Sequence, residues 1–257
     1  SILAEGDATL LAGPGSRAPV RSLPASLDAA GTAMVGRADD LARLTEMWKA
    51  ATACRGGFVA IVGEEGAGKT RLAAALAAEA HRSGAVIAYA RCDADHRSAR
   101  TLLDQALRSA NGSLVAAQAQ GRPGEALGIG VGRHLATWSQ RWPVLLVLDD
   151  LDRADAGVLE VVADLTAEVT SSATLVLGIF RSERGDGGRA TGAGARLAIG
   201  GLSSQEVAEV CALYGDAWTT DDLRRIGAAS GGLPLAVHEM AAAAARQAMA
   251  SEVRAAT

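Results

Sequence analysis

GEEGAGKT at residues 63–70 fits G-x-x-x-x-G-K-[ST], the pattern of the phosphate-binding P-loop. Residues 58–62 before it are apolar and rich in β-branched side chains, which predicts a buried strand. After it, Leu72 and Leu76 stand at helical spacing among alanines, which predicts a helix over residues 71–80. Because a P-loop joins a strand to a helix, this context favours the motif over a chance glycine-rich turn.

The residue types in this stretch suit the binding of phosphate. Glycine lets the backbone adopt conformations that side chains disfavour, so that several N–H groups point inward. The N-terminus of the following helix adds a partial positive charge. Lys69 is expected to reach the β- and γ-phosphates, and the Thr70 hydroxyl to bind Mg²⁺. We therefore predict a site for ATP or ADP with Mg²⁺, to which the loop contributes Gly63, Glu64, Glu65, Gly66, Ala67, Gly68, Lys69 and Thr70.

A second motif lies about 80 residues after the P-loop. Residues 144–148, VLLVL, predict a strand buried on both faces, and Asp149 and Asp150 follow it. This pattern fits a Walker B element, in which an aspartate holds Mg²⁺. We assign that role to Asp149, and to Asp150 the orientation or deprotonation of the attacking water. The alternative, a pair of solvated acids, is less favoured because both motifs face one edge of a parallel sheet.

Single basic residues give weaker signals. Arg181 follows the predicted strand at residues 174–180, where a guanidinium can sense or stabilise the γ-phosphate, with a surface ion pair as the alternative. Arg37 and Arg71 equally suit solvated helical positions on pattern alone. His238 is interpreted as a residue that packs the C-terminal helices rather than one that faces the nucleotide.

Strands alternate with helices over the first part of the chain, which predicts a three-layer α/β fold with a parallel sheet. No clear period marks residues 112–132, and the glycines at 128–132 are interpreted as a turn before a helix at 133–140. Five strands are expected, at residues 58–62, 86–90, 144–148, 174–180 and 196–199, with further helices at 39–51, 71–80, 98–110 and after Asp155.

The pattern changes near residue 200. Capping boxes at residues 203–206 and 219–222 open two helices, and an Ala-rich helix follows at residues 235–250. We therefore predict a P-loop NTPase core over residues 34–200 and a small all-helical lid over residues 201–257.

Composition narrows the classes of function. A net charge of −4 argues against a general basic surface for nucleic acid. The three cysteines form no metal or C-x-x-C pattern and suit a reducing cytoplasm, and no apolar run is long enough to span a bilayer. Residues 13–33, rich in Pro, Gly and Ala, are interpreted as a linker, and residues 1–33 as the tail of a preceding domain with that linker.

These motifs resemble those of the STAND class of AAA+-related signalling ATPases over about residues 34–250. The likeness is greatest to SARP/AfsR-like regulators, which contain a bacterial transcriptional activation domain, and to large LuxR-type regulators. Residues 1–11 also resemble the last helix of such an activation domain. The runs that carry the resemblance are VGR at 35–37, GKTRLA at 68–73, RCD at 91–93, LLVLDDL at 145–151 and GLPLA at 232–236.

The resemblance implies a switch, in which ADP holds a closed monomer and ATP opens it and permits self-association. DNA recognition would belong to domains outside this sequence. Asp152 and Arg153 replace a His-Trp pair common in this group, so they are assigned no role. The family places Arg181 as a sensor arginine and Val35, Gly36, Arg37 and Pro234 near the adenine, and we add Arg71, directly after the loop, to the nucleotide contacts.

Three functions stay open. The first is a slowly hydrolysing ATP/ADP switch of a signal-responsive transcriptional regulator, and the second is a nucleotide-binding scaffold without turnover. The third is an AAA+ loader or origin-binding ATPase, for which Arg184 and Arg189 fit poorly as trans-acting arginine fingers in a glycine-rich stretch. A small-molecule kinase is the least favoured class, because no pattern indicates a pocket for an acceptor substrate.

Overall fold

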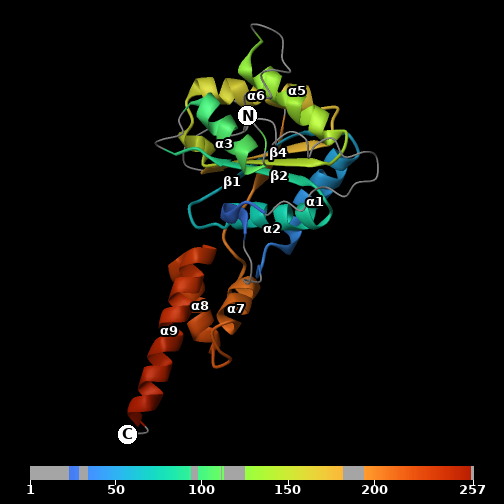
Figure 1. The fold of residues 1–257 in the computed structure, drawn as a ribbon. Coiled ribbons are helices and arrows are strands. Elements are labelled where there is room, and N and C mark those ends of the chain that lie inside the picture. The colour runs from blue at the N-terminus through green and yellow to red at the C-terminus, as the bar shows by residue number, and fades with distance from the viewer. Residues whose placement is uncertain are drawn as a thin grey trace, which may run out of the picture.

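The computed structural model describes residues 23–28, 34–93, 98–110, 112, 125–181 and 194–255. Its centre is a parallel sheet of five strands in the order β2-β3-β4-β1-β5, which confirms the predicted α/β class (Figure 1). The strands are β1 (Gly57–Gly63), β2 (Val86–Arg91), β3 (Val144–Asp149), β4 (Thr174–Arg181) and β5 (Ala195–Ala198).

Helices cover both faces of the sheet. One face carries α1 (Ala38–Thr52) and α2 (Lys69–Arg82), and the other carries α3 (Ala99–Ser109), α5 (Leu127–Ser139) and α6 (Ala156–Val169) (Figure 1). Strand β3 shows why its sequence is uniformly apolar. Leu145 and Val147 pack among the residues of the α1–α2 side, while Leu146 and Leu148 pack on the α3–α5–α6 side.

The interpretation of residues 128–132 as a turn is wrong. These residues lie inside α5, which begins at Leu127, six residues before the expected start at residue 133. A Cβ on Gly128 would lie 2.3 Å from the Val161 carbonyl oxygen, and one on Gly132 would lie 2.7 Å from Glu168 Cβ. The glycines therefore let α5 approach α6 closely, a use that single-sequence periodicity does not reveal.

Part of the predicted linker packs on the core. The short 3-10 helix η2 (Ala25–Leu27) buries Leu27 completely among residues of α1, α2 and the sheet. Burial of the apolar Leu27 side chain is favourable in free energy, so η2 contributes to the stability of the core. The expected helix at residues 1–11, the rest of the linker, Arg184 and Arg189 lie outside the described residues.

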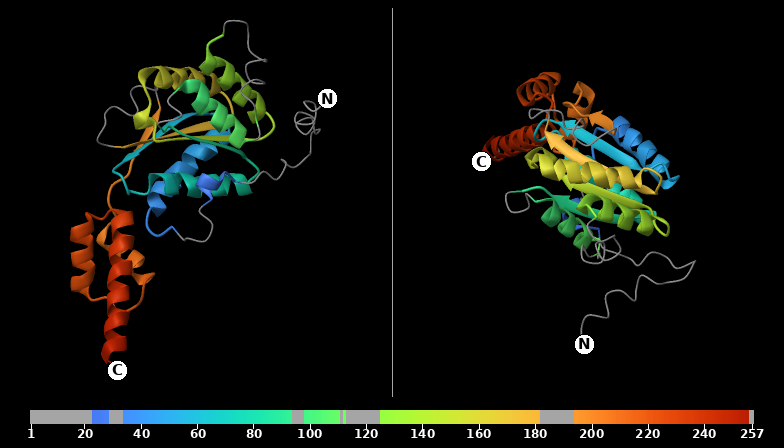
Figure 2. Two further views of the ribbon diagram at one scale, coloured as in Figure 1. Left: turned by 60° about the vertical axis from the view of Figure 1, so that its left-hand side comes forward. Right: turned by 90° about the horizontal axis from the view of Figure 1, so that it is seen from above.

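The C-terminal helices form a unit with its own core. They are α7 (Ser204–Ala212), α8 (Thr220–Ser230) and α9 (Pro234–Ala255), and both predicted capping boxes are present. Val207, Ile226 and Val237 are among the buried residues that join them. Helix α9 projects beyond α7 and α8, away from the sheet (Figures 1 and 2). Among the described helices, none combines the length and apolar character needed to cross a membrane.

Candidate active site

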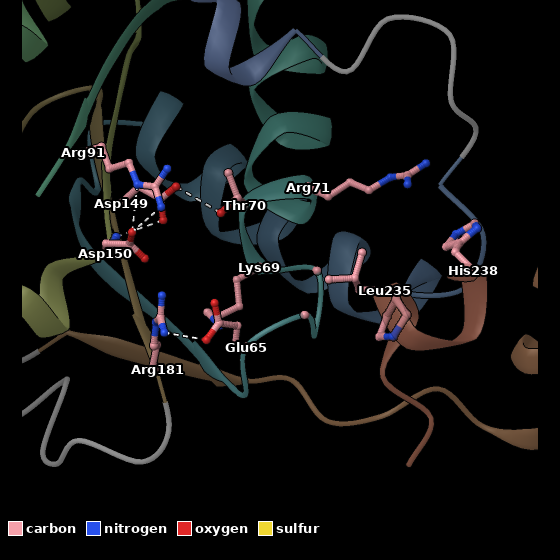
Figure 3. Close-up of a pocket in the computed structure, with 13 residues that line it drawn as sticks. Glu65, Lys69, Thr70, Arg71, Arg91, Asp149, Asp150, Arg181, Leu235 and His238 are labelled. Atoms are coloured by element: carbon pink, nitrogen blue, oxygen red, sulfur yellow. Dashed lines mark hydrogen bonds and ion pairs between the residues drawn. The ribbon is translucent and has the colours of Figure 1, made fainter. Parts of the chain in front are cut away.

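A cavity of about 370 Å³ lies where the carboxyl ends of β1, β3 and β4 face the start of α9 (Figure 3). Its walls combine three features that are remote in sequence: the P-loop, the two acids at the end of β3, and the first turn of α9. The lining residues are Glu65, Gly66, Gly68, Lys69, Thr70, Arg71, Arg91, Asp149, Asp150, Arg181, Pro234, Leu235 and His238.

Lys69 opens α2 and is only 8% exposed. Its Nζ donates to the carbonyl oxygens of Gly63, at 2.9 Å, and of Glu64, at 2.7 Å. Burial lowers the pKa of Lys69, and the positive charge of Arg181 lowers it further. Lys69 and Arg181 are two cations that repel each other in one cavity. A bound anion such as a phosphate chain would relieve this repulsion.

Asp149 ends β3 and is almost completely buried. Its Oδ2 accepts hydrogen bonds from Thr70 Oγ1 at 3.0 Å and Tyr89 Oη at 3.3 Å, and its Oδ1 accepts one from the Asp150 backbone N–H at 2.9 Å. Burial, and secondly the charge of Asp150, raise the pKa of Asp149. A hydroxyl and a carboxylate at this separation suit Mg²⁺, which takes one or two protein ligands together with phosphate oxygens and water.

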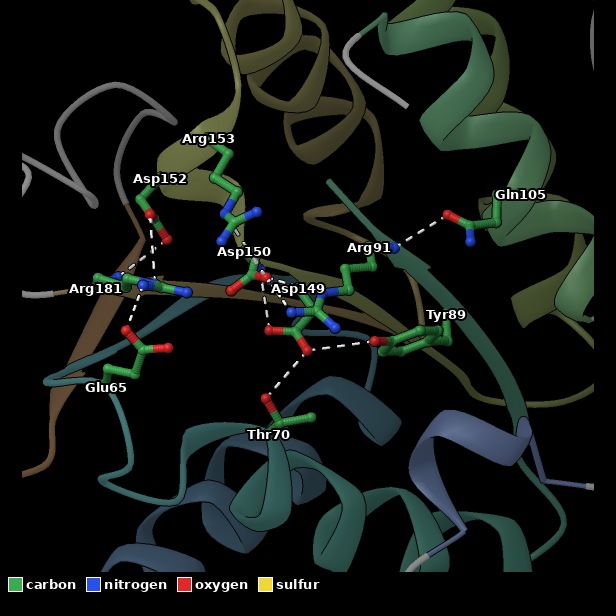
Figure 4. A network of polar contacts seen from close by, with 10 residues as sticks. All are labelled: Glu65, Thr70, Tyr89, Arg91, Gln105, Asp149, Asp150, Asp152, Arg153 and Arg181. Atoms are coloured by element: carbon green, nitrogen blue, oxygen red, sulfur yellow. Dashed lines mark hydrogen bonds and ion pairs between the residues drawn. The ribbon is translucent and has the colours of Figure 1, made fainter. Parts of the chain in front are cut away.

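Asp150 is held in an ion pair that the sequence did not indicate (Figure 4). The guanidinium of Arg91, at the end of β2, contacts Asp150 Oδ2 through Nε at 2.8 Å and Nη2 at 2.7 Å. Arg153 lies 4.0 Å from the same oxygen. Asp150 also has a left-handed backbone, with φ of 55°. The sequence showed Arg91 only as part of a family likeness, and the parallel register Arg91↔Asp149 is what brings it to the acids.

Arg181 lies at the cavity, at the end of β4 as expected. Its Nη1 contacts Glu65 Oε2 of the P-loop at 2.6 Å. Its backbone N–H donates to Asp152 Oδ1 at 3.2 Å, so Asp152 supports the position of the arginine. The ion pair with Glu65 and the predicted contact with a γ-phosphate compete for the same guanidinium.

The start of α9 reaches the P-loop. The Leu235 backbone N–H donates to the Gly66 carbonyl oxygen at 3.3 Å, and Pro234 and His238 line the same cavity. His238 Nδ1 is 2.9 Å from Tyr214 Oη, so His238 both packs the helical unit and faces the cavity. Burial and then the charge of Arg71, which lines the cavity as well, lower the pKa of His238.

Residues 35–37 are not among the residues that line this cavity. Arg37 is 9% exposed, and its Nη2 donates to the carbonyl oxygens of Ala67, at 3.1 Å, and Gly200. The solvated-helix alternative is therefore wrong for Arg37. Its backbone N–H donates to Glu206 Oε1 at 3.0 Å, so the same residue contacts the helical unit. Sequence reasoning found Glu206 only as a helix cap and missed this link.

Val35 and Gly36 extend the contact with the helical unit. Val35 packs against its core, and a Cβ on Gly36 would lie 2.9 Å from the Leu202 side chain. The adenine contacts predicted for residues 35–37 and Pro234 stay predictions, as do the catalytic roles of Lys69, Asp150 and Arg181.

Solved structures with this fold include DNA-bound and multiprotein assemblies. The Aeropyrum pernix ORC1 protein in complex with DNA is 18% identical with a TM-score of 0.53, over 88% of this chain and 64% of that chain. Drosophila ORC bound to DNA is 13% identical with a TM-score of 0.57, over 95% and 63%. A chain of the E. coli MS115-1 HORMA:CdnC:Trip13 complex is 16% identical with a TM-score of 0.52, over 77% and 74%.

At these identities the likeness shows the fold alone, and this chain spans less than two thirds of the two ORC chains. No curated protein matches the sequence significantly. The family model of the AAA ATPase domain matches residues 33–177, more than half of the 257 residues, and this stretch contains the P-loop and both acids. The chain therefore belongs to the AAA ATPase domain family.

Proposed function

We propose that this AAA ATPase domain is a nucleotide-dependent switch of a multidomain, signal-responsive transcriptional regulator. It binds ATP and ADP with Mg²⁺ and hydrolyses ATP slowly. The observation that carries the proposal is the single cavity lined by the P-loop, by Asp149 and Asp150, and by the first turn of α9. A ligand that binds there touches the phosphate site and the helical unit at once.

Each residue has a chemical role in this proposal. Lys69 and the loop N–H groups hold the phosphates, for which Lys69 exchanges its contacts with the Gly63 and Glu64 carbonyls. Thr70 and Asp149 hold Mg²⁺, which supplies neutralisation of phosphate charge. Asp150 orients the attacking water. The ion pair with Arg91 restricts the movement of the Asp150 carboxylate, and this restriction supports slow turnover.

In this proposal, two contacts connect the core to the lid, which is the helical unit formed by α7, α8 and α9, and they couple the nucleotide site to that unit. Leu235 donates to the Gly66 carbonyl of the P-loop, and Glu206 accepts from Arg37, whose guanidinium holds Ala67 of the same loop. ATP and ADP differ at the γ-phosphate, beside Glu65 and Arg181. A nucleotide shifts the angle between lid and core only through such differential contacts.

The regulatory setting rests on the likeness to STAND, SARP/AfsR-like and large LuxR-type proteins. In this setting the module acts in the cytoplasm and self-associates when ATP is bound. Its DNA contacts come from domains outside the sequence, which agrees with its net charge of −4.

An origin-binding ATPase is the second candidate, favoured by the DNA-bound ORC proteins among the similar structures. Fluorescence anisotropy with a labelled duplex in the presence of Mg²⁺ and ATP separates the two. The switch proposal expects no binding by this chain at physiological salt. Specific binding by the chain alone would favour the origin-binding candidate.

Nucleotide binding by the purified chain tests the proposal directly. The chain has two lysines, so Lys49→Ala, which removes an exposed lysine paired with Glu46, is a matched control for Lys69→Ala. Calorimetry with ADP and ATP plus Mg²⁺ is expected to show a loss of roughly 10- to 100-fold in affinity for Lys69→Ala, typical of lost charge-assisted bonds, and none for Lys49→Ala.

A measurement of phosphate release distinguishes the slowly hydrolysing switch from a scaffold that binds nucleotide without turnover. Asp150→Asn is expected to reduce kcat by about 100-fold while ADP affinity is kept, as for loss of a general base. Turnover that is zero in the wild type would favour the scaffold without hydrolysis. If the wild type, Lys69→Ala and Lys49→Ala all bind nucleotide with equal affinity, the proposed nucleotide site is refuted.

A further inference from the structure

The Asp149 carboxylate is held from two sides. On one side is Thr70, its proposed partner in binding Mg²⁺, and on the other is Tyr89 of β2, which sequence reasoning passed over (Figure 4). Both hydroxyls bond to the same oxygen, Oδ2. Tyr89 is itself fixed, because it is 6% exposed and its backbone N–H donates to Ser109 Oγ at 2.7 Å.

The segment before the core reaches Tyr89. The Ser26 side chain of η2 lies near the Tyr89 hydroxyl, and the completely buried Leu27 anchors η2 beside α2. Ser26 also forms part of the wall of a second polar cavity of about 450 Å³, on the magnesium side of the site. Its lining includes Ser26, Thr70, Tyr89, Arg91, Asp149 and Asp150.

We propose that Tyr89 is a positioning residue of the magnesium site and that η2 holds it in place through Ser26. In this proposal the Ser26 hydroxyl donates to Tyr89 Oη, while the Tyr89 hydroxyl donates to Asp149 Oδ2 at 3.3 Å. Without the second bond, the carboxylate keeps its contacts with Thr70 and with the Asp150 backbone but gains rotational freedom that metal binding must remove. The inference rests on the proposed function, because it assumes that Asp149 binds Mg²⁺.

The protonation state of Tyr89 agrees with this role. An ordinary phenol has a pKa of about 10 and is a hydrogen-bond donor at physiological pH, and the burial of Tyr89 favours this neutral form. The proposed series of hydrogen bonds from Ser26 through Tyr89 to Asp149, here called the relay, also has a consequence for regulation. A movement of the segment that contains η2 withdraws Ser26 and loosens Asp149, which weakens nucleotide binding only where it depends on Mg²⁺.

Magnesium titration of nucleotide binding tests the relay without relying on turnover. The full chain is titrated with a fluorescent ADP analogue, first in EDTA and then at increasing Mg²⁺. The variants are Tyr89→Phe and Ser26→Ala. The control is Ser139→Ala, which deletes a hydroxyl bonded to the Ala136 carbonyl in α5, on the other face of the sheet.

For Tyr89→Phe, the half-saturating Mg²⁺ concentration is expected to rise about 3- to 10-fold, as for the loss of one net hydrogen bond, with affinity in EDTA unchanged. For Ser26→Ala we expect a smaller rise, of about 2-fold, since it acts through Tyr89. The control keeps the wild-type response. Because Ser26 is exposed, Ser26→Ala is expected to fold, so it tests the link through η2 even where Tyr89→Phe fails to fold.

Three outcomes would overturn the inference. An unchanged Mg²⁺ response in both variants removes the positioning role. An equal loss of affinity in EDTA and in Mg²⁺ reveals a general packing role instead. A wild-type chain that binds no nucleotide refutes the proposed function and the inference with it, whereas normal binding with an unaltered Mg²⁺ response refutes the inference alone.

Discussion

Residues 63–68 and residues 128–132 each contain three glycines, yet the first stretch forms the P-loop and the second lies within a helix. In the loop, Gly66 and Gly68 have φ values of 81° and 90°, which other residues adopt only with strain. In α5, Gly128 has ordinary helical geometry but almost no room for a side chain. Glycine therefore supplies an unusual backbone conformation in one place and a close approach of two helices in the other.

The largest expected effect is that of Gly128→Ala. The new Cβ would lie 2.3 Å from the Val161 carbonyl oxygen, and a backbone atom moves only if α5 and α6 separate. We expect the free energy of unfolding in urea to fall by about 3 kcal/mol, as for overpacking in a core. ADP affinity of the folded protein is expected to stay unchanged. A loss below about 1 kcal/mol would show that the helices separate easily.

Gly68→Ala is expected to have an intermediate effect on stability and a strong one on binding. The nearest atom to its Cβ would be Pro234 Cγ, at 3.9 Å, so the cost is backbone strain of about 1–2 kcal/mol rather than a clash. Relaxation of this strain turns loop N–H groups away from the phosphates. Calorimetry with ADP is expected to show weakened binding. Wild-type affinity would mean that the loop tolerates a side chain here.

Gly84→Ala is the matched comparison for Gly68→Ala. Gly84 has φ of 89°, follows α2 at the end remote from the P-loop, and no heavy atom lies within 4 Å of a Cβ built on it. The urea midpoint is expected to fall by the equivalent of about 1 kcal/mol, from strain alone. ADP binding should not change. A loss of affinity in this variant would show that strain anywhere near α2 disturbs the site.

The smallest effect, with the opposite sign, is expected for Gly130→Ala. Gly130 lies in the same helix as Gly128, but its Cβ would come no closer than 3.5 Å to Glu125 Oε2. Alanine there should stabilise the protein by about 0.5–1 kcal/mol, because glycine loses more backbone entropy in a helix. Thermal unfolding checks the sign. A lower Tm would indicate that α5 requires glycine on more than its α6 face.

Much of the candidate site was predictable because each part has a local pattern. The P-loop, the two acids and Arg181 each lie at the carboxyl end of a strand, and parallel strands bring these ends to one edge. The helix caps at Ser203 and Thr219 were predictable for the same reason, since donor and acceptor lie three residues apart.

The contacts that sequence reasoning missed join residues that lie far apart along the chain. Tyr89 contacts Asp149, Arg91 contacts Asp150, and Arg37 contacts Glu206. No local sequence pattern links the two members of any of these pairs. The glycines of α5 were misread for a related reason, because the need for them comes from Val161 and Glu168 of a different helix.

The sequence by itself determined the strand–loop–helix unit predicted at residues 58–80, the α/β class and the positions of most helices. These follow from periodicity, capping and the conformational freedom of glycine, all of which act within a few residues. Only the tertiary structure decided that η2 packs beside α2, that Tyr89 bonds to Asp149, and that α9 contacts the P-loop. Such contacts depend on strand order and helix packing, and a single sequence does not encode these in its local pattern.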